Sequence, residues 1–122
     1  IEQIHPYIAA MDALLMCSDH EGLPITALEA MSLNCPLVAH QVGGLIDLLD
    51  RGRCGWPVTE QSPEAYAAAI RSVLGDSHQR TAVLARAKER VSTRHTAKLC
   101  AERYLAAYHS CLPAHGPNKV KM

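Results

Sequence analysis

The 122-residue sequence contains no phenylalanine, one tryptophan and four tyrosines. Aromatic side chains for stacking on bases are therefore scarce, which argues against a binder of single-stranded nucleic acid. An excess of one charge is also missing, because twelve Lys and Arg balance twelve Asp and Glu. Proteins that bind nucleic acid or anionic membranes through their surface generally carry a basic excess. The composition therefore argues against both classes of partner.

The five cysteines include no CxxC pair, and their number is odd. Cys17 and Cys35 lie in apolar runs, where a free cysteine behaves as a small buried hydrophobic residue. We therefore expect free thiols and a reducing compartment rather than a disulfide framework. The seven histidines form neither HxxxH nor HExxH, so we expect no metal site.

Long apolar runs are absent as well, since none approaches the roughly 20 residues of a membrane span. No signal-peptide pattern is visible. With 48% hydrophobic residues, the chain is nevertheless rich enough in apolar side chains to bury one modest core. The first residue is Ile1 and a helical pattern follows almost at once, so we interpret the chain as a piece of something longer.

Apolar periodicity predicts short strands that alternate with helices. Pro24 suits the first position of a helix, Asn34 a helix end, and Ser62 before Pro63 a helix start. The predicted strands cover 13–17, 36–40 and 55–58, and the predicted helices 4–11, 24–33, 45–49, 63–74, 77–91 and 96–111, with a break at 92–95.

This alternation, with short loops and without hairpin signals, predicts an α/β fold with a parallel sheet. We expect the strand over 13–17 to be buried on both faces, because it is continuously apolar. The three C-terminal helices should cover the sheet, and their apolar stripes are interpreted as core. Gly43-Gly44 is predicted to form a flexible loop, and 112–122, which contains two Pro and a Gly, a flexible tail.

The segment SDHEGLPITALEAM carries Glu21 in a turn and Glu29 within the helix that follows. Ligands of parallel sheets bind beyond the carboxyl ends of the strands, where helix N-termini offer free N–H groups to phosphates. Gly22 permits a close approach, and the helical side chain of Glu29 leans back toward the same place. A carboxylate can accept two hydrogen bonds from the vicinal hydroxyls of a ribose.

The same spacing also fits an ordinary surface. Glu21 is then a solvated turn residue and Glu29 an exposed helical position that is favoured by propensity. The spacing alone does not decide between these two interpretations. Arg51 and Arg53, which flank Gly52, are interpreted as solvated turn residues rather than as phosphate contacts.

Residues 12–58 read DALLMCSDHEGLPITALEAMSLNCPLVAHQVGGLIDLLDRGRCGWPV and resemble the C-terminal domain of family-4 (group 1) retaining glycosyltransferases, which have the GT-B fold. Shared elements are an apolar strand, Ser, Glu-Gly, Leu-Glu-Ala-Met, a second apolar strand and Gly-Gly. Glu21 and Glu29, with seven residues between them, match the family's E-x7-E motif. Tyr104 and Tyr108 lie near its usual aromatic positions, whereas Asp47 stands where Glu is commoner.

The resemblance implies a Rossmann-like sheet that binds a nucleotide-diphosphate sugar, whose sugar is transferred with retention of configuration. Within that role, Glu21 lies by the donor sugar as the catalytic position and Glu29 binds the ribose hydroxyls. The diphosphate and sugar are held by the backbone of Gly22, Leu23, Ile25 and Thr26. The resemblance implies no bound metal or other cofactor.

The resemblance also implies what other parts must supply. Residues 1–111 are expected to form the second half of a donor-binding domain, and the upstream half and an N-terminal acceptor domain should precede it. The chain alone should then be inactive. The acceptor is an unknown sugar, lipid or glycan, and we expect a cytoplasmic location, with the inner membrane face as an option. The alternatives are a non-catalytic GT-B-like domain that serves in assembly and a nucleotide-sugar epimerase of the same fold.

Overall fold

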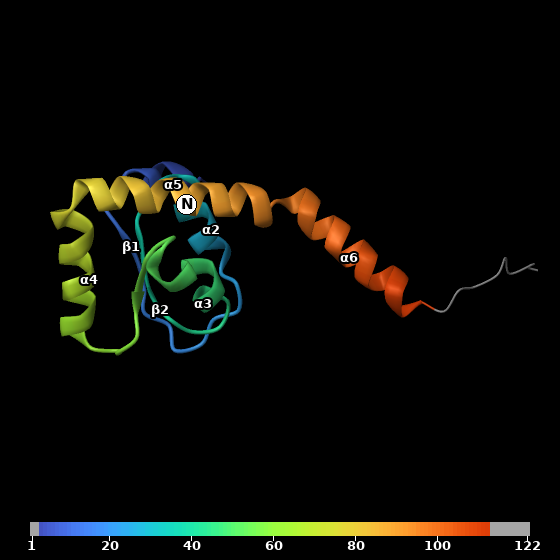
Figure 1. The fold of residues 1–122 in the computed structure, drawn as a ribbon, viewed down its shortest axis with the longest axis horizontal. Helices are drawn as coiled ribbons and strands as arrows, with labels where there is room; N and C mark the ends of the chain where they lie inside the picture. Colours follow the sequence, from blue (N-terminus) through green and yellow to red (C-terminus); the bar gives the residue numbers. More distant parts are fainter. Residues whose placement is uncertain (1–2, 113–122) are drawn as a thin grey trace, which may run out of the picture.

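The computed structural model describes residues 3–112 and shows an α/β body from which one helix extends (Figure 1). Three strands form a parallel sheet in the order β1-β2-β3, which confirms the predicted fold class. The strands are β1 (Leu14–Met16), β2 (Leu37–His40) and β3 (Trp56–Val58). The helices are α1 (His5–Ala9), α2 (Ile25–Ser32), α3 (Gly44–Leu49), α4 (Pro63–Gly75), α5 (Ser77–Arg94) and α6 (Ala97–Cys111), with a 3₁₀ turn at Asp50–Gly52.

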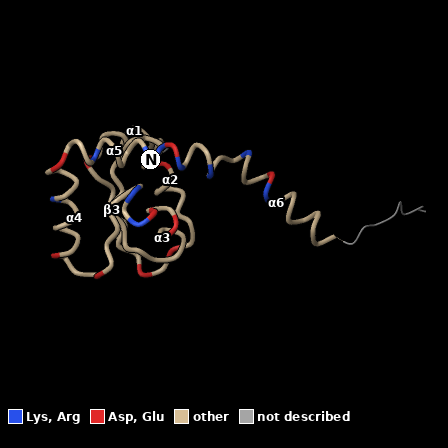
Figure 2. Tube along the Cα trace, viewed as in Figure 1, with Lys and Arg blue, Asp and Glu red and all other residues tan. Residues whose placement is uncertain are grey.

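The central strand β2 is buried on both faces, and its side chains alternate between two clusters. Leu37 and Ala39 pack with residues of α2, α3 and α5, whereas Val38 packs with residues of β3, α4 and α5. A continuous apolar run predicts a strand that is buried on both faces, and β2 is such a strand. Charged residues of both signs are spread over the body rather than gathered on one element (Figure 2).

The prediction that β1 is buried on both faces is wrong, because the Leu15 side chain is 41% exposed. Among the described residues, β1 pairs only with β2 and is an edge strand, and α4 packs on β2 and β3 instead. Cys17, which follows this edge, is exposed, so only Cys35 behaves as the expected buried thiol. An apolar run therefore predicts a strand, but not what covers it.

Local signals located the helix ends to within a few residues. The Ser62 hydroxyl accepts a hydrogen bond from the Ala65 N–H, and Asn34 adopts φ 57°, so both capping predictions are confirmed. Pro24 is extended and precedes the first helical residue instead of occupying it. Helix α5 also continues three residues past the predicted end, and within this added turn the Thr93 hydroxyl donates to the Glu89 carbonyl.

The prediction that three C-terminal helices cover the sheet is wrong for α6. This helix has no buried residue and extends away from the body (Figure 1). Tyr104, Leu105 and Tyr108 are exposed by 63%, 57% and 64%. Their helical spacing predicted a helix correctly, yet a periodic stripe does not identify the surface against which it packs.

The division into a domain over 1–111 and a tail over 112–122 stays a prediction, since residues 113–122 lie outside the described part. Within the described part, none of the helices combines the length and the apolar character needed to span a bilayer.

Candidate functional site

The loops that follow β1 and β2 are in direct backbone contact at the carboxyl edge of the sheet. The Gly44 N–H donates a hydrogen bond of 2.7 Å to the Gly22 carbonyl oxygen. Gly43 adopts φ 52°, and a Cβ added there would overlap the Glu21 carbonyl oxygen and lie 2.8 Å from its carbon. The prediction of a flexible Gly43-Gly44 loop is therefore wrong, since these glycines permit a close backbone approach.

Side chains from two other elements fix the loop after β1. His40, at the end of β2, places Nδ1 3.0 Å from the Ser18 carbonyl oxygen. Gln61 donates from Nε2 to the Cys17 carbonyl and to the Asp19 carboxylate, each at 2.9 Å. The Tyr66 hydroxyl donates to Gln61 Oε1. Burial raises the pKa of Tyr66 to about 12, so this hydroxyl keeps its proton and orients the amide.

Replacement of Gln61 by alanine should loosen this loop. The substitution removes two hydrogen bonds to the loop and leaves the Tyr66 hydroxyl without its acceptor, for a loss of roughly 1 kcal/mol of unfolding free energy. We expect faster amide hydrogen exchange over residues 17–23 in Gln61→Ala. The exposed neighbour gives the control, Glu60→Ala, which should exchange like the unaltered protein. Equal protection of the loop in both variants would contradict this role of Gln61.

Helix α2 begins at this loop with uncompensated donors. Among the described residues, the N–H groups of Gly22, Leu23, Ile25 and Thr26 make no hydrogen bond. No acidic residue lies in the first turn, and no side chain caps the helix. These N–H groups and the positive end of the helix dipole therefore form a suitable place for a phosphate or diphosphate.

The two predicted glutamates occupy different surroundings. Glu29 Oε1 lies 3.0 Å from His5 Nε2, and Glu29 and Ile25 line one hollow between α1, α2 and α5. Leu23 lines an adjoining hollow, and Leu28 borders both. Glu21, Gly22 and Thr26 lie outside the lining of these hollows. Among the described residues, the Glu21 carboxylate has no hydrogen bond or ion pair, so it is available to a ligand of the loop.

Sequence reasoning missed two histidines that border this region. His5 contacts Glu29 from α1, and His95, at the end of α5, lines both hollows. The buried His95 Nε2 has no hydrogen-bond partner in the described part of the chain. Burial lowers the pKa of His95, and nearby Arg90 lowers it further, so the ring is neutral at pH 7. Neither residue has a local signal, because both reach the site from distant parts of the chain.

A metal has no ready place in the described part of the chain. Among residues 3–112, His, Cys, Asp and Glu side chains form no group of three or more that is arranged to hold an ion. The loop itself offers backbone N–H groups, the Glu21 carboxylate and the N-terminus of α2.

Residues 1–90 match the family described as "Glycosyl transferases group 1". The chain is 34% identical over 119 residues to a D-inositol 3-phosphate glycosyltransferase of Corynebacterium urealyticum, which covers 95% of this chain and 28% of that protein. Its fold matches a sucrose-phosphate synthase of Thermosynechococcus elongatus with a TM-score of 0.79 and 26% identity, covering 88% of this chain and 27% of the other.

A second solved structure has the same fold. It is the Anabaena protein HepE, solved in complex with UDP, with a TM-score of 0.79 and 23% identity over 85% of this chain and 29% of the other. In each of these three comparisons, the chain spans less than a third of the other protein's length.

Proposed function

This chain belongs to the group 1 glycosyl transferases, with the GT-B fold, and on that premise we propose that it forms the donor-binding part of its enzyme. The proposed donor is a nucleotide-diphosphate sugar, and the proposed reaction transfers its sugar to an acceptor with retention of anomeric configuration. The observation that carries the donor site is the set of unpaired N–H groups where the loop after β1 enters α2. Anomeric retention is tested by proton NMR of the product made by the full-length protein.

The proposed donor lies along the loop and the first turn of α2. The N–H groups of Leu23, Ile25 and Thr26 would donate to the diphosphate, and Gly22, which has open space around it, admits the ligand. These donors are already oriented by the contacts of the loop, so binding would require little reorganisation. A solved relative of the same fold binds UDP, which supports a nucleotide as ligand.

The two glutamates would serve opposite ends of the donor. Glu29, half-buried beside His5, would accept hydrogen bonds from the ribose hydroxyls. Glu21 would lie by the transferred sugar, where charge develops as the glycosidic bond to the diphosphate breaks. Its carboxylate can interact with that sugar because no described residue occupies it. We propose that the leaving diphosphate is stabilised by backbone N–H groups and needs no bound metal.

We also propose that activity requires parts of the enzyme beyond this chain. The chain spans 28% of the Corynebacterium relative, and the sheet of its described residues has three strands. The acceptor and its binding surface would belong to another domain of the same protein. The 122-residue chain alone is then expected to be inactive, which an assay beside the full-length protein tests.

Replacement of Glu29 by alanine should weaken nucleotide binding. Loss of two charge-assisted hydrogen bonds to the ribose should raise the Kd roughly tenfold to a hundredfold. Calorimetric titration of the full-length protein with UDP, GDP and ADP measures this effect for the nucleotide that binds. Glu64→Ala, which removes an exposed carboxylate from the first turn of α4, is the control and should bind normally. An unchanged Kd in Glu29→Ala would refute the ribose-binding role.

A further inference from the structure

A second polar region lies away from the proposed donor site, between α5 and the turn that precedes β3. A hollow of about 220 Å³ there is lined by four arginines and two carboxylates, Arg53, Arg86, Arg90, Arg94, Asp50 and Glu89. This hollow lies beside the residues that lead into β3, whereas the proposed donor loop follows the end of β1. No residue of the proposed donor loop lines this hollow, although Asp50 and Arg53 also line a neighbouring hollow together with Gly43.

We propose that this hollow, called here the arginine groove, binds a phosphate dianion, either inorganic phosphate or the phosphate of a monoester. Four guanidinium groups face the Asp50 and Glu89 carboxylates of the lining, and the Asp47 carboxylate pairs with Arg90 at 3.2 Å from outside it, so an excess of one positive charge remains. Guanidinium N–H groups are planar donors whose spacing matches phosphate oxygens. The surplus positive charge and the donors favour a multivalent oxyanion over a cation or an uncharged ligand.

Some of the guanidinium donors are already used within the protein. Arg90 donates to the Asp47 carbonyl at 2.8 Å and contacts the Asp50 carboxylate at 3.5 Å, and its side chain is only 10% exposed. Its Nε is buried without a hydrogen-bond partner in the described residues. Arg90 therefore forms the fixed inner wall of the groove and leaves a buried donor unsatisfied.

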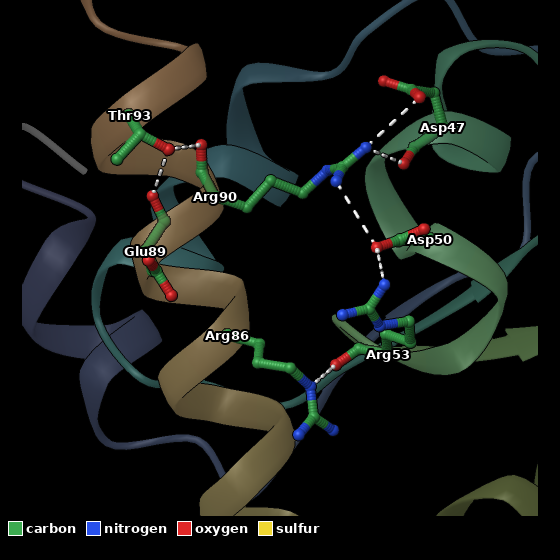
Figure 3. A network of polar contacts seen from close by, with 7 residues as sticks. All are labelled: Asp47, Asp50, Arg53, Arg86, Glu89, Arg90 and Thr93. Atoms are coloured by element: carbon green, nitrogen blue, oxygen red, sulfur yellow. Dashed lines mark hydrogen bonds and ion pairs between the residues drawn. The ribbon is translucent and has the colours of Figure 1, made fainter.

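Other donors in the groove are free. Arg86 uses only Nε, which donates to the Arg53 carbonyl at 2.8 Å, so both of its terminal nitrogens lack partners among the described residues. The Arg53 side chain is 70% exposed and has one long contact of 3.8 Å with Asp50. Figure 3 shows Arg53, Arg86 and Arg90 extending into the space between α5 and the turn. A phosphate bound between α5 and the turn would accept from these free donors.

The backbone keeps Arg53 beside α5. Asp50, Arg51 and Gly52 have φ values of 47°, 53° and 87°, a left-handed run that is rare for residues with a side chain. Arg86 and Arg90 hold this turn through the Arg53 carbonyl and the Asp50 carboxylate. The interpretation of Arg53 as a solvated turn residue thus describes its exposure but misses the donors that the fold places next to it.

The test is a titration of the protein with sodium phosphate, followed by amide NMR at constant ionic strength in a buffer without other oxyanions. We expect saturable shifts of the residue 53 and residue 86 amides. Arg53→Gln should weaken binding about tenfold through loss of charge-assisted hydrogen bonds. That variant keeps the backbone carbonyl to which Arg86 donates, so the turn should remain folded. Lys88→Gln, an exposed change of equal charge on α5, should alter the Kd by less than about twofold.

Other outcomes would overturn the proposal. The proposal is wrong if the groove shows no saturable shifts or if the shifts are confined to residues 22–26. It is also wrong if Arg53→Gln and Lys88→Gln weaken phosphate binding equally. Arg86→Lys gives a second variant, which retains the charge but loses the planar fork, and we expect it to bind phosphate more weakly than the unaltered protein. A parallel titration with glycerol phosphate distinguishes the two candidate ligands. Tighter binding of glycerol phosphate than of inorganic phosphate identifies a monoester as the ligand, and weaker binding identifies the free ion.

Discussion

Gly44→Ala is expected to disrupt the contact between the loops after β1 and β2 and to impair nucleotide binding. A Cβ at Gly44 would overlap the Gly22 carbonyl oxygen and lie 3.0 Å from the Gly22 carbonyl carbon and 3.3 Å from the Leu23 Cα. These are backbone atoms that cannot rotate away, so the loop or α3 must shift. Overpacking of this kind costs about 1–3 kcal/mol of unfolding free energy. Urea unfolding and a nucleotide titration measure the two losses.

The matched control is Gly22→Ala on the other side of the same contact. Nothing lies within 4 Å of a Cβ added at Gly22, so this variant should unfold like the unaltered protein. It should nevertheless reduce nucleotide binding if the ligand approaches the backbone at Gly22. Equal stability of Gly44→Ala and Gly22→Ala would show that the close approach is not required.

Arg90→Met should destabilise the fold by about 2 kcal/mol, because the substitution keeps most of the buried apolar stem but removes the guanidinium. The Asp47 carbonyl at the end of α3 and the Asp50 carboxylate then lose a partner that lies on α5 (Figure 3). The cost stays below that of a fully buried pair, since the Asp50 and Asp47 side chains are 31% and 80% exposed. Urea unfolding gives the free energy.

An exposed ion pair on α6 provides the comparison. Lys98 and Glu102 are 4.0 Å apart and their side chains are 86% and 57% exposed, so Lys98→Met should cost less than about 0.5 kcal/mol. If Arg90→Met proves as mild as Lys98→Met, the network between α3 and α5 contributes little to stability.

The local elements of the fold were predictable from the sequence, because their signals are local. Ser62 before Pro63 marked the start of α4, and Asn34 marked the end of α2. The open face of β1 and the bare surface of α6 were not predictable. An apolar side chain such as Leu15 or Leu105 shows a preference for burial, whereas its actual cover depends on elements far away in the sequence or outside the described chain.

The candidate site was predictable only in part, because some of its signals are local and others are contacts between distant parts of the chain. The loop with Glu21 and the start of α2 carry a turn and a helix signal within a few residues of each other. The contacts of His40, Gln61 and Gly44 with this loop span 22 or more positions along the chain. Contacts over such separations depend on how strands and loops meet, which propensity and spacing do not describe.

The most direct test of the donor site is an amide NMR titration of the full-length protein with UDP, GDP and ADP. We expect one nucleotide to shift the Gly22, Leu23, Ile25 and Thr26 amides in a saturable manner. In Glu29→Ala the same shifts should need roughly tenfold to a hundredfold more nucleotide, and in Glu64→Ala they should appear at the concentrations that the unaltered protein needs. A well-dispersed spectrum in which every nucleotide leaves these four amides unmoved, or moves others instead, would contradict a donor site at the start of α2.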